Sequence, residues 1–193
     1  MTENNEISKL FDQSISIISE CKNLSEVITK VSVRIVEAIK NKNKIILFGN
    51  GGSAADAQHM AAELIGRFLL TRQSIPAISL TTDTSVLTAL GNDFGFENIF
   101  SRQCESIVSK GDIIIAISTS GNSSNVINCV KTAKEKGGII IGFTGMSGGK
   151  LSDLTDEIIK APTSNTPEIQ ECHRIIIHIL CNLVEKSLAD DIT

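Results

Sequence analysis

The chain has 193 residues, with 18 lysines and arginines against 22 aspartates and glutamates, and therefore a net charge of −4. This length fits one domain, which we take as residues 1–193, and a chain of this size buries enough core to fold without disulfides or a structural metal. The mild acidity argues against non-specific nucleic-acid binding, and a chain without tryptophan or tyrosine is a poor stacking surface for bases or sugars.

The first residues and the cysteines favour a cytoplasmic protein. The N-terminal ten residues are polar and acidic, so they do not resemble a secretory signal. No apolar run reaches the ~18 residues needed to cross a bilayer, so we expect no membrane partner. The five cysteines show no C-x-x-C spacing and fit small buried side chains in a reducing compartment.

The first forty residues predict helices. Apolar side chains recur with helical spacing from Ile7 to Ile18, and the same spacing returns from Leu24 to Ile35. The polar residues 41–43 end this segment.

After residue 43 the period changes, and short apolar runs alternate with polar turns and helical patterns. These runs predict strands at 44–48, 76–80, 112–117, 139–143 and 157–160, of which the second and the last are the weaker. A long helix over 167–189 follows. This alternation predicts a three-layer α/β/α sandwich around a five-stranded parallel sheet of the flavodoxin-like type, with its sheet core over 44–160.

Two polar loops follow strands of this sheet, at the edge where open parallel sheets bind ligands. The first is Gly49–Ser53, whose glycines allow tight turns and close backbone approach before a helix N-terminus. It has neither the dinucleotide fingerprint nor a P-loop lysine. The second, residues 118–124, offers hydroxyl and amide donors that suit a phosphate monoester. Either loop alone is also compatible with ordinary turn and cap chemistry.

Polar stripes mark two helices that are otherwise apolar. His59 and Glu63 lie one turn apart after the first loop. The C-terminal helix carries a matching stripe: Gln170, Arg174, His178, Asn182 and Glu185. One interpretation makes both stripes solvated faces.

The alternative interpretation makes the stripes opposing walls of one site. His59, Glu63 and His178, with Gln170, can bind a divalent metal such as Zn²⁺. Glu63 and His178 can equally act as a base and acid pair. His173 lies off the stripe, and the sequence assigns it no role.

Four longer motifs carry a family resemblance that covers nearly the whole chain. They are Gly49–Leu64, 89–103, 117–126 and 169–180. With these motifs the chain resembles the sugar isomerase (SIS) domain family, and within it the phosphoheptose isomerases. Glu168 is a departure, since the family commonly has a basic residue there.

The resemblance implies an aldose–ketose isomerase that converts sedoheptulose 7-phosphate to D-glycero-D-manno-heptose 7-phosphate through an enediol. It implies Glu63 as the base and His178 as the acid/base, with one Zn²⁺ held by His59, Glu63, Gln170 and His178. The substrate contacts that it implies are Asn50, Gly51, Gly52, Ser53, Glu63, Asn92, Asp93, Ser118, Thr119, Ser120, Ser123 and Gln170.

The same resemblance implies a homotetramer with sites at subunit interfaces, to which the helices of residues 1–40 contribute packing. The product then feeds the synthesis of lipopolysaccharide or capsule heptose. The alternative within the family is a non-catalytic module that binds a replication initiator or senses sugar phosphates. A carboxylate at position 63 and an imidazole at position 178 favour the enzyme over this scaffold.

Overall fold

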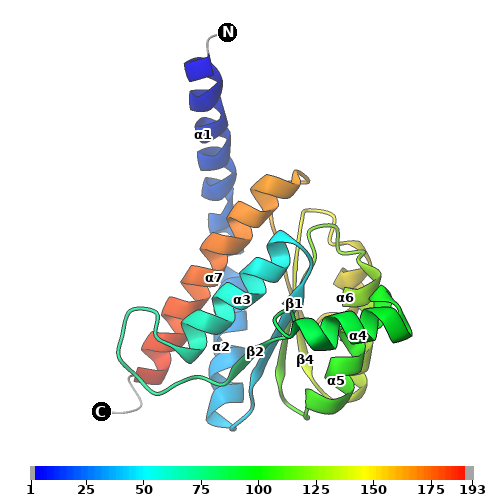
Figure 1. Ribbon diagram of the computed structural model, residues 1–193. Coiled ribbons are helices and arrows are strands. Elements are labelled where there is room, and N and C mark those ends of the chain that lie inside the picture. The colour runs from blue at the N-terminus through cyan, green and yellow to red at the C-terminus, as the bar shows by residue number, and fades with distance from the viewer. Residues whose placement is uncertain (1–2, 190–193) are drawn as a thin grey trace.

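The computed structural model describes residues 3–189, which form an all-parallel sheet between two layers of helices (Figure 1). The strand order is β2-β1-β3-β4-β5. The strands are β1 (Ile45–Gly49), β2 (Ala77–Ser79), β3 (Ile113–Ile117), β4 (Ile139–Thr144) and β5 (Glu157–Lys160). The predicted flavodoxin-like sandwich is confirmed, and the two weaker apolar runs are its edge strands.

The sheet builds outward from β1 in both directions. Ile45 of β1 pairs with Ala77 of β2 on one side and with Ile113 of β3 on the other. The strand order therefore reverses between β1 and β3, and the loops that follow these two strands diverge. Such a switch point is where open parallel sheets form a ligand crevice. The loops concerned are the two that the sequence singled out, after Gly49 and after Ile117.

Strand residues alternate between two apolar cores. Ile45 and Leu47 face a layer made of α2 (Ser25–Lys40), α3 (Gly52–Ile65) and α7 (Thr166–Ala189). Ile46 and Phe48 face the opposite layer, which contains α5 (Ser101–Ile107) and α6 (Ser124–Glu135). Because both faces are covered, β1 and β3 are buried at every position, as their unbroken apolar sequences predict.

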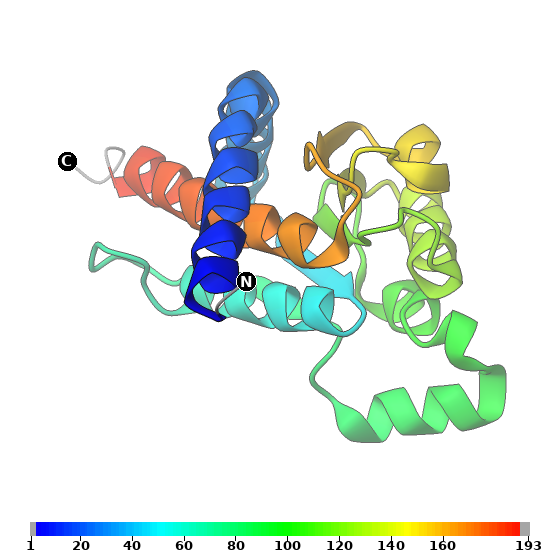
Figure 2. The ribbon, with the colours of Figure 1, turned by 90° about the horizontal axis from the view of Figure 1, so that it is seen from above.

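The N-terminal helix stands apart from this body (Figures 1 and 2). The helix α1 (Glu3–Glu20) contains no buried residue and exposes Leu10, Phe11 and Ile15. A 3₁₀ turn (Cys21–Leu24) joins it to α2. The predicted N-terminal helices are confirmed, and the apolar stripe of α1 remains uncovered in the single chain.

Two helices were missing from the sequence prediction. The first is α4 (Thr84–Phe94), which begins where the Asp83 side chain accepts a hydrogen bond from the backbone N–H of Val86. The second is the short α5, which packs against α6. The sequence held two signals for α4: the cap before Val86, and the helical spacing of Val86, Leu87, Leu90 and Phe94.

All five cysteines are buried and free, as expected of small apolar side chains. Within residues 3–189, no helix has the length and apolar character that a membrane span requires.

Candidate active site

The helices α3 and α7 lie side by side (Figure 1). Polar residues of the two helices face one another along the seam between them. Gln170 lies against Gly52 at the start of α3, and Arg174 reaches Asp56 one turn on. His178 then meets His59. A spacing of three or four residues along each helix puts these side chains on one face, so the two predicted stripes are walls of one seam rather than solvated faces.

Three titratable side chains converge on this seam. His59 Nε2 and His178 Nε2 are 2.8 Å apart, so one ring donates a hydrogen bond to the other. The Glu63 Oε1 atom lies 3.5 Å from His59 Nε2. The side chains of His59 and Glu63 are 31% and 25% exposed, so solvent and a ligand can reach them. The carboxylate and the two imidazoles that the sequence singled out therefore lie together in the fold.

The environment keeps the His59 ring neutral. Burial lowers its pKa from the ordinary value, and the nearby Arg174 charge adds to this, against the opposing charge of Glu63. A neutral imidazole is the form that a metal requires as a ligand.

The spacing of the three groups fits a metal ion. The ligand atoms of His59, Glu63 and His178 all lie within 4.8 Å of one another. Ligands about 2.0–2.2 Å from a tetrahedral Zn²⁺ lie roughly 3.3–3.6 Å from each other. A small outward rotation of the two rings from their hydrogen bond would accommodate the ion, and two imidazoles with a carboxylate are a donor set that zinc favours.

Gln170 lies two turns from His178, at the other end of the seam. A Cβ atom on Gly52 would come within 2.5 Å of Gln170 Nε2, so the glycine makes room for this amide against the start of α3. Between Gln170 and the histidines, Arg174 Nη2 lies 2.5 Å from Asp56 Oδ1. Gln170 as the fourth metal ligand therefore stays a prediction, and its position also suits a substrate contact.

Asp56 is a buried acidic residue on the seam, with a side chain that is 3% exposed. Burial raises its pKa above the ordinary value, and the Arg174 guanidinium opposes the rise. Its second oxygen, Oδ2, has no hydrogen-bond partner among the described residues.

The first loop turns sharply before α3. Gly51 has a φ of 56°, a left-handed conformation that favours glycine. Asn50 exchanges two side-chain hydrogen bonds of 2.9 Å with Asn125 at the start of α6. This pair ties the first loop to the second, and Asn125 was not among the predicted site residues. Ser53 is buried at the start of α3.

The second loop forms one wall of a cleft of about 260 Å³. The residues that line this cleft are uncharged, and five of them carry hydroxyls: Thr119, Ser120, Ser147, Ser164 and Thr166. Ser118 lies buried beneath it, with its Oγ 3.1 Å from the Oγ of Ser123. Ser147 and Ser164 were not predicted, because they come from loops that only the fold brings to this edge.

A glycine shapes this wall. Gly121 has a φ of 64°, and a Cβ atom there would come within 2.0 Å of the carbonyl oxygen of Gly148. The position therefore requires glycine, and it lets the loop after β4 pack against the loop after β3.

Asn92 and Asp93 are predicted contacts that lie on α4, away from the seam and from the two loops. Both are exposed on α4 and hydrogen-bond to each other at 2.7 Å. The helix α4 has no buried residue and projects from the body (Figure 2).

His173, the third histidine, is structural. It is fully buried, and its Nε2 donates to the carbonyl of Thr144 at the end of β4. Burial lowers the pKa of His173 to about 4.

Comparisons with known proteins show the family of this chain. A family model described as the SIS domain matches residues 9–145. A phosphoheptose isomerase of a Nitratiruptor species is 56% identical over 156 residues, which are 81% of this chain and 83% of that protein. The phosphoheptose isomerase of Aquifex aeolicus is 49% identical over 185 residues, 95% of this chain and 97% of that protein. The chain belongs to the phosphoheptose isomerase family of SIS domains.

The structural likeness is equally extensive. The structure of phosphoheptose isomerase GmhA from Neisseria gonorrhoeae has a TM-score of 0.91 and 40% sequence identity, and it covers 96% of this chain and 100% of that one. The protein is accordingly an enzyme, an isomerase of the phosphoheptose isomerase family.

Glu168, the residue at which the resemblance implies a basic side chain, lies next to Ile169, which lines the cleft. Its Oε2 accepts a 2.5 Å hydrogen bond from the hydroxyl of Thr163. The same hydroxyl accepts from the backbone N–H of Asn165. The carboxylate thus orders the turn before α7.

Proposed function

We propose that this protein converts sedoheptulose 7-phosphate to D-glycero-D-manno-heptose 7-phosphate in the bacterial cytoplasm. The observation that supports it most is the convergence of Glu63, His59 and His178, whose ligand atoms lie within 4.8 Å of one another. The hydroxyl-lined cleft opens at the other end of the same seam, since Ile169 lines the cleft and adjoins Gln170.

The chemistry is a proton transfer next to a carbonyl. Glu63 takes the proton from C1 of the ketose, and the C1–H electron pair forms the C1–C2 double bond of an enediol. His178 gives a proton to the oxygen on C2 and accepts the proton of the hydroxyl on C1. When Glu63 returns its proton to C2, the C1 carbonyl of the aldose forms. Atoms and electrons balance without a redox cofactor.

The cleft supplies the anchor for the phosphate. Its hydroxyls are neutral donors, and they bind the phosphate equally in the ketose, the enediol and the aldose. Binding energy from this remote group fixes the reacting carbons against the seam. We assign Ser118, Thr119, Ser120 and Ser123 to this contact. Thr119 and Ser120 line the cleft, and the hydroxyls of Ser118 and Ser123 lie 3.1 Å apart.

We also propose one Zn²⁺ per chain, held by His59, Glu63 and His178 with Gln170. The ion would act as a Lewis acid that polarises the substrate carbonyl. Elemental analysis of the purified protein tests this proposal. We expect about one zinc per chain in the parent and a clear loss in His59→Asn; zinc at the parent level in His59→Asn would overturn the assignment.

We propose further that the enzyme is a homotetramer whose sites are completed by neighbouring subunits. The uncovered apolar stripe of α1 and the exposed position of Asn92 and Asp93 support this. Light scattering after size exclusion should give four times the chain mass. A monomer with full turnover would refute the proposal.

Incubation with sedoheptulose 7-phosphate, followed by ¹H and ³¹P NMR, tests the function. We expect an aldose phosphate to accumulate, and the unphosphorylated sugar to react much more slowly. Zinc-loaded protein that binds the ketose phosphate without forming any aldose would instead indicate the non-catalytic sensing role.

A further inference from the structure

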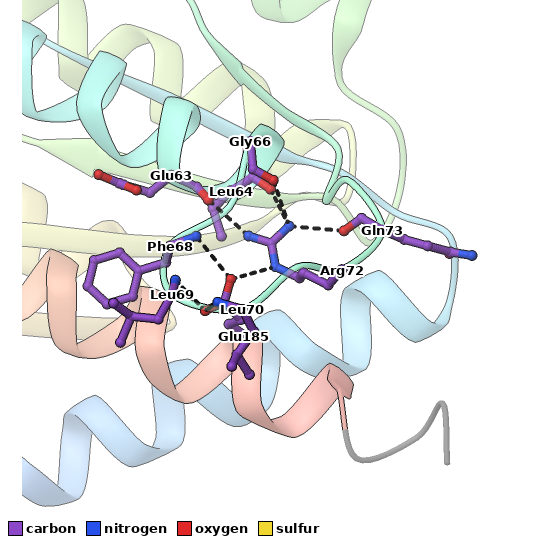
Figure 3. A network of polar contacts seen from close by, with 9 residues as sticks. All are labelled: Glu63, Leu64, Gly66, Phe68, Leu69, Leu70, Arg72, Gln73 and Glu185. Atoms are coloured by element: carbon purple, nitrogen blue, oxygen red, sulfur yellow. Dashed lines mark hydrogen bonds and ion pairs between the residues drawn. The ribbon is translucent and has the colours of Figure 1, made fainter.

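A buried carboxylate holds the loop that follows α3 (Figure 3). Glu185 of α7 has a side chain that is 1% exposed. It accepts hydrogen bonds from three consecutive backbone N–H groups, those of Phe68, Leu69 and Leu70, at 2.9, 2.7 and 2.8 Å. Three such bonds fix the path of this segment relative to α7.

Arg72 connects the same carboxylate to the end of α3. Its Nε lies 3.1 Å from Glu185 Oε1, and its side chain is 3% exposed. Its Nη2 donates to the carbonyl of Glu63 at 2.9 Å, and its Nη1 to that of Leu64 at 2.8 Å. Carbonyls in the last turn of a helix lack helical partners, so Arg72 caps the turn that carries Glu63.

Glu185 is ionised in this setting. Burial alone raises its pKa, but the three N–H donors and the Arg72 charge together bring the pKa below its ordinary value.

Phe68 links the Glu185 carboxylate to the His178 imidazole, because its backbone bonds to the first and its ring contacts the second. Its ring centroid lies 5.6 Å from that of His178, with 32° between the ring planes. The side chain also packs against the apolar core beneath α7. The N–H of Phe68 is one of the three that Glu185 holds, so the position of the ring against His178 depends on that carboxylate.

We propose that Glu185 and Arg72 are positioning residues of the isomerase, which hold the Phe68 ring against His178 and fix the turn of α3 that carries Glu63. This inference rests on the proposed function, because it assigns the two groups being positioned to that reaction. The Arg72–Glu185 ion pair thus fixes groups beside His178 on α7 and beside Glu63 on α3.

A positioning role explains the buried Arg72–Glu185 pair better than a stabilising role does. Replacing a buried ion pair by apolar residues is often neutral or stabilising, so burial of Arg72 and Glu185 is weak evidence for a stabilising role. Six of their contacts instead fix backbone groups at the histidine end of the seam: three N–H groups and the carbonyls of Glu63, Leu64 and Gln73.

The first experiment measures kcat and KM of Phe68→Leu, which keeps an apolar side chain but removes the ring. We expect kcat to fall about tenfold with KM changed less than twofold, since a displaced catalytic group costs turnover. Thr71→Ala is the matched control, because Thr71 is exposed in the same loop and takes no part in the described network.

A double-mutant cycle separates positioning from general damage. In a His178→Gln background, Phe68→Leu should lower kcat no further, because the group it positions is gone. An equal fold-loss in both backgrounds, or no loss in either, would overturn the proposal.

A second experiment does not depend on activity, so it also stands if the proposed function fails. With ¹³C-labelled histidine rings, the His178 signal is identified by its loss in His178→Gln. We expect Phe68→Leu and Glu185→Gln both to shift that signal, and Thr71→Ala to leave it in place. A folded Glu185→Gln variant with an unmoved His178 signal would show that the carboxylate does not position the ring.

Discussion

Along the α3–α7 seam, titratable side chains contact one another: two imidazoles meet at 2.8 Å with a carboxylate beside them. In the cleft after β3, the lining side chains are uncharged and offer hydroxyls instead. The seam therefore offers groups of the kinds that accept and donate protons, whereas the cleft offers neutral hydrogen-bonding groups. Substitutions of seam residues should therefore lower kcat, and substitutions of cleft residues should raise KM.

The largest effect is expected at Glu63. Glu63→Gln keeps the shape of the side chain but removes the base, so turnover should fall by about 10²–10⁴ while the thermal midpoint stays close to that of the parent. Steady-state kinetics measure the loss.

The matched control is Glu171→Gln, which neutralises an exposed carboxylate on α7. It should behave like the parent. Parent-like turnover in Glu63→Gln would remove the base from the seam.

The second largest effect is expected at His173, which is connected both to the seam and to the cleft. It shares α7 with His178 and bonds to Thr144, whose neighbour Gly145 lines the cleft. Its pKa of about 4 in the fold is below the ~6.5 of an unfolded histidine. The contribution of neutral His173 to the free energy of unfolding is therefore fully present above pH 6.5. It decreases as the pH falls toward 4, and at pH 4.5 the loss is about 2–3 kcal/mol.

Urea unfolding at pH 7 and pH 4.5 measures this loss. His173→Gln can still donate to the Thr144 carbonyl but cannot titrate, so its loss between the two pH values should be smaller than the parent's by that amount. Identical losses would mean that His173 does not titrate as its burial requires. Carboxylates contribute to both proteins alike and cancel in the difference.

The smallest effect is expected in the cleft. Ser120→Ala removes one neutral hydroxyl donor from the phosphate, so KM should rise about three- to tenfold with kcat nearly unchanged. A fall in kcat at constant KM would break the distinction between seam and cleft. An unchanged KM would place the phosphate elsewhere.

The sheet was predictable because its strands are unbroken apolar runs such as Ile113–Ile117, whose burial on both faces leaves no alternative. The helix α4 was missed although Leu87, Leu90 and Phe94 recur with helical spacing, and it packs only partly against the core, through Leu87 and Leu90. In the site, His59, Glu63 and His178 followed from helical spacing. Phe68, Arg72 and Ser164 could not be predicted, since they lie in loops whose positions depend on tertiary packing.

The remaining site residues were predicted from the family resemblance. Some of them lie away from the seam and the cleft in the single chain. Asn92 and Asp93 are exposed on α4. No pattern within the sequence indicates which neighbouring surface such residues face, because that depends on assembly rather than on the fold of a single chain.

The most direct test of the central claim is exchange of the C1 proton of sedoheptulose 7-phosphate with solvent D₂O, followed by NMR. A carboxylate that takes this proton passes it to solvent in some turnovers. We predict deuterium at C1 of the ketose and C2 of the aldose with the parent, and loss of this exchange in Glu63→Gln. Exchange in Glu63→Gln as fast as in the parent would contradict the account.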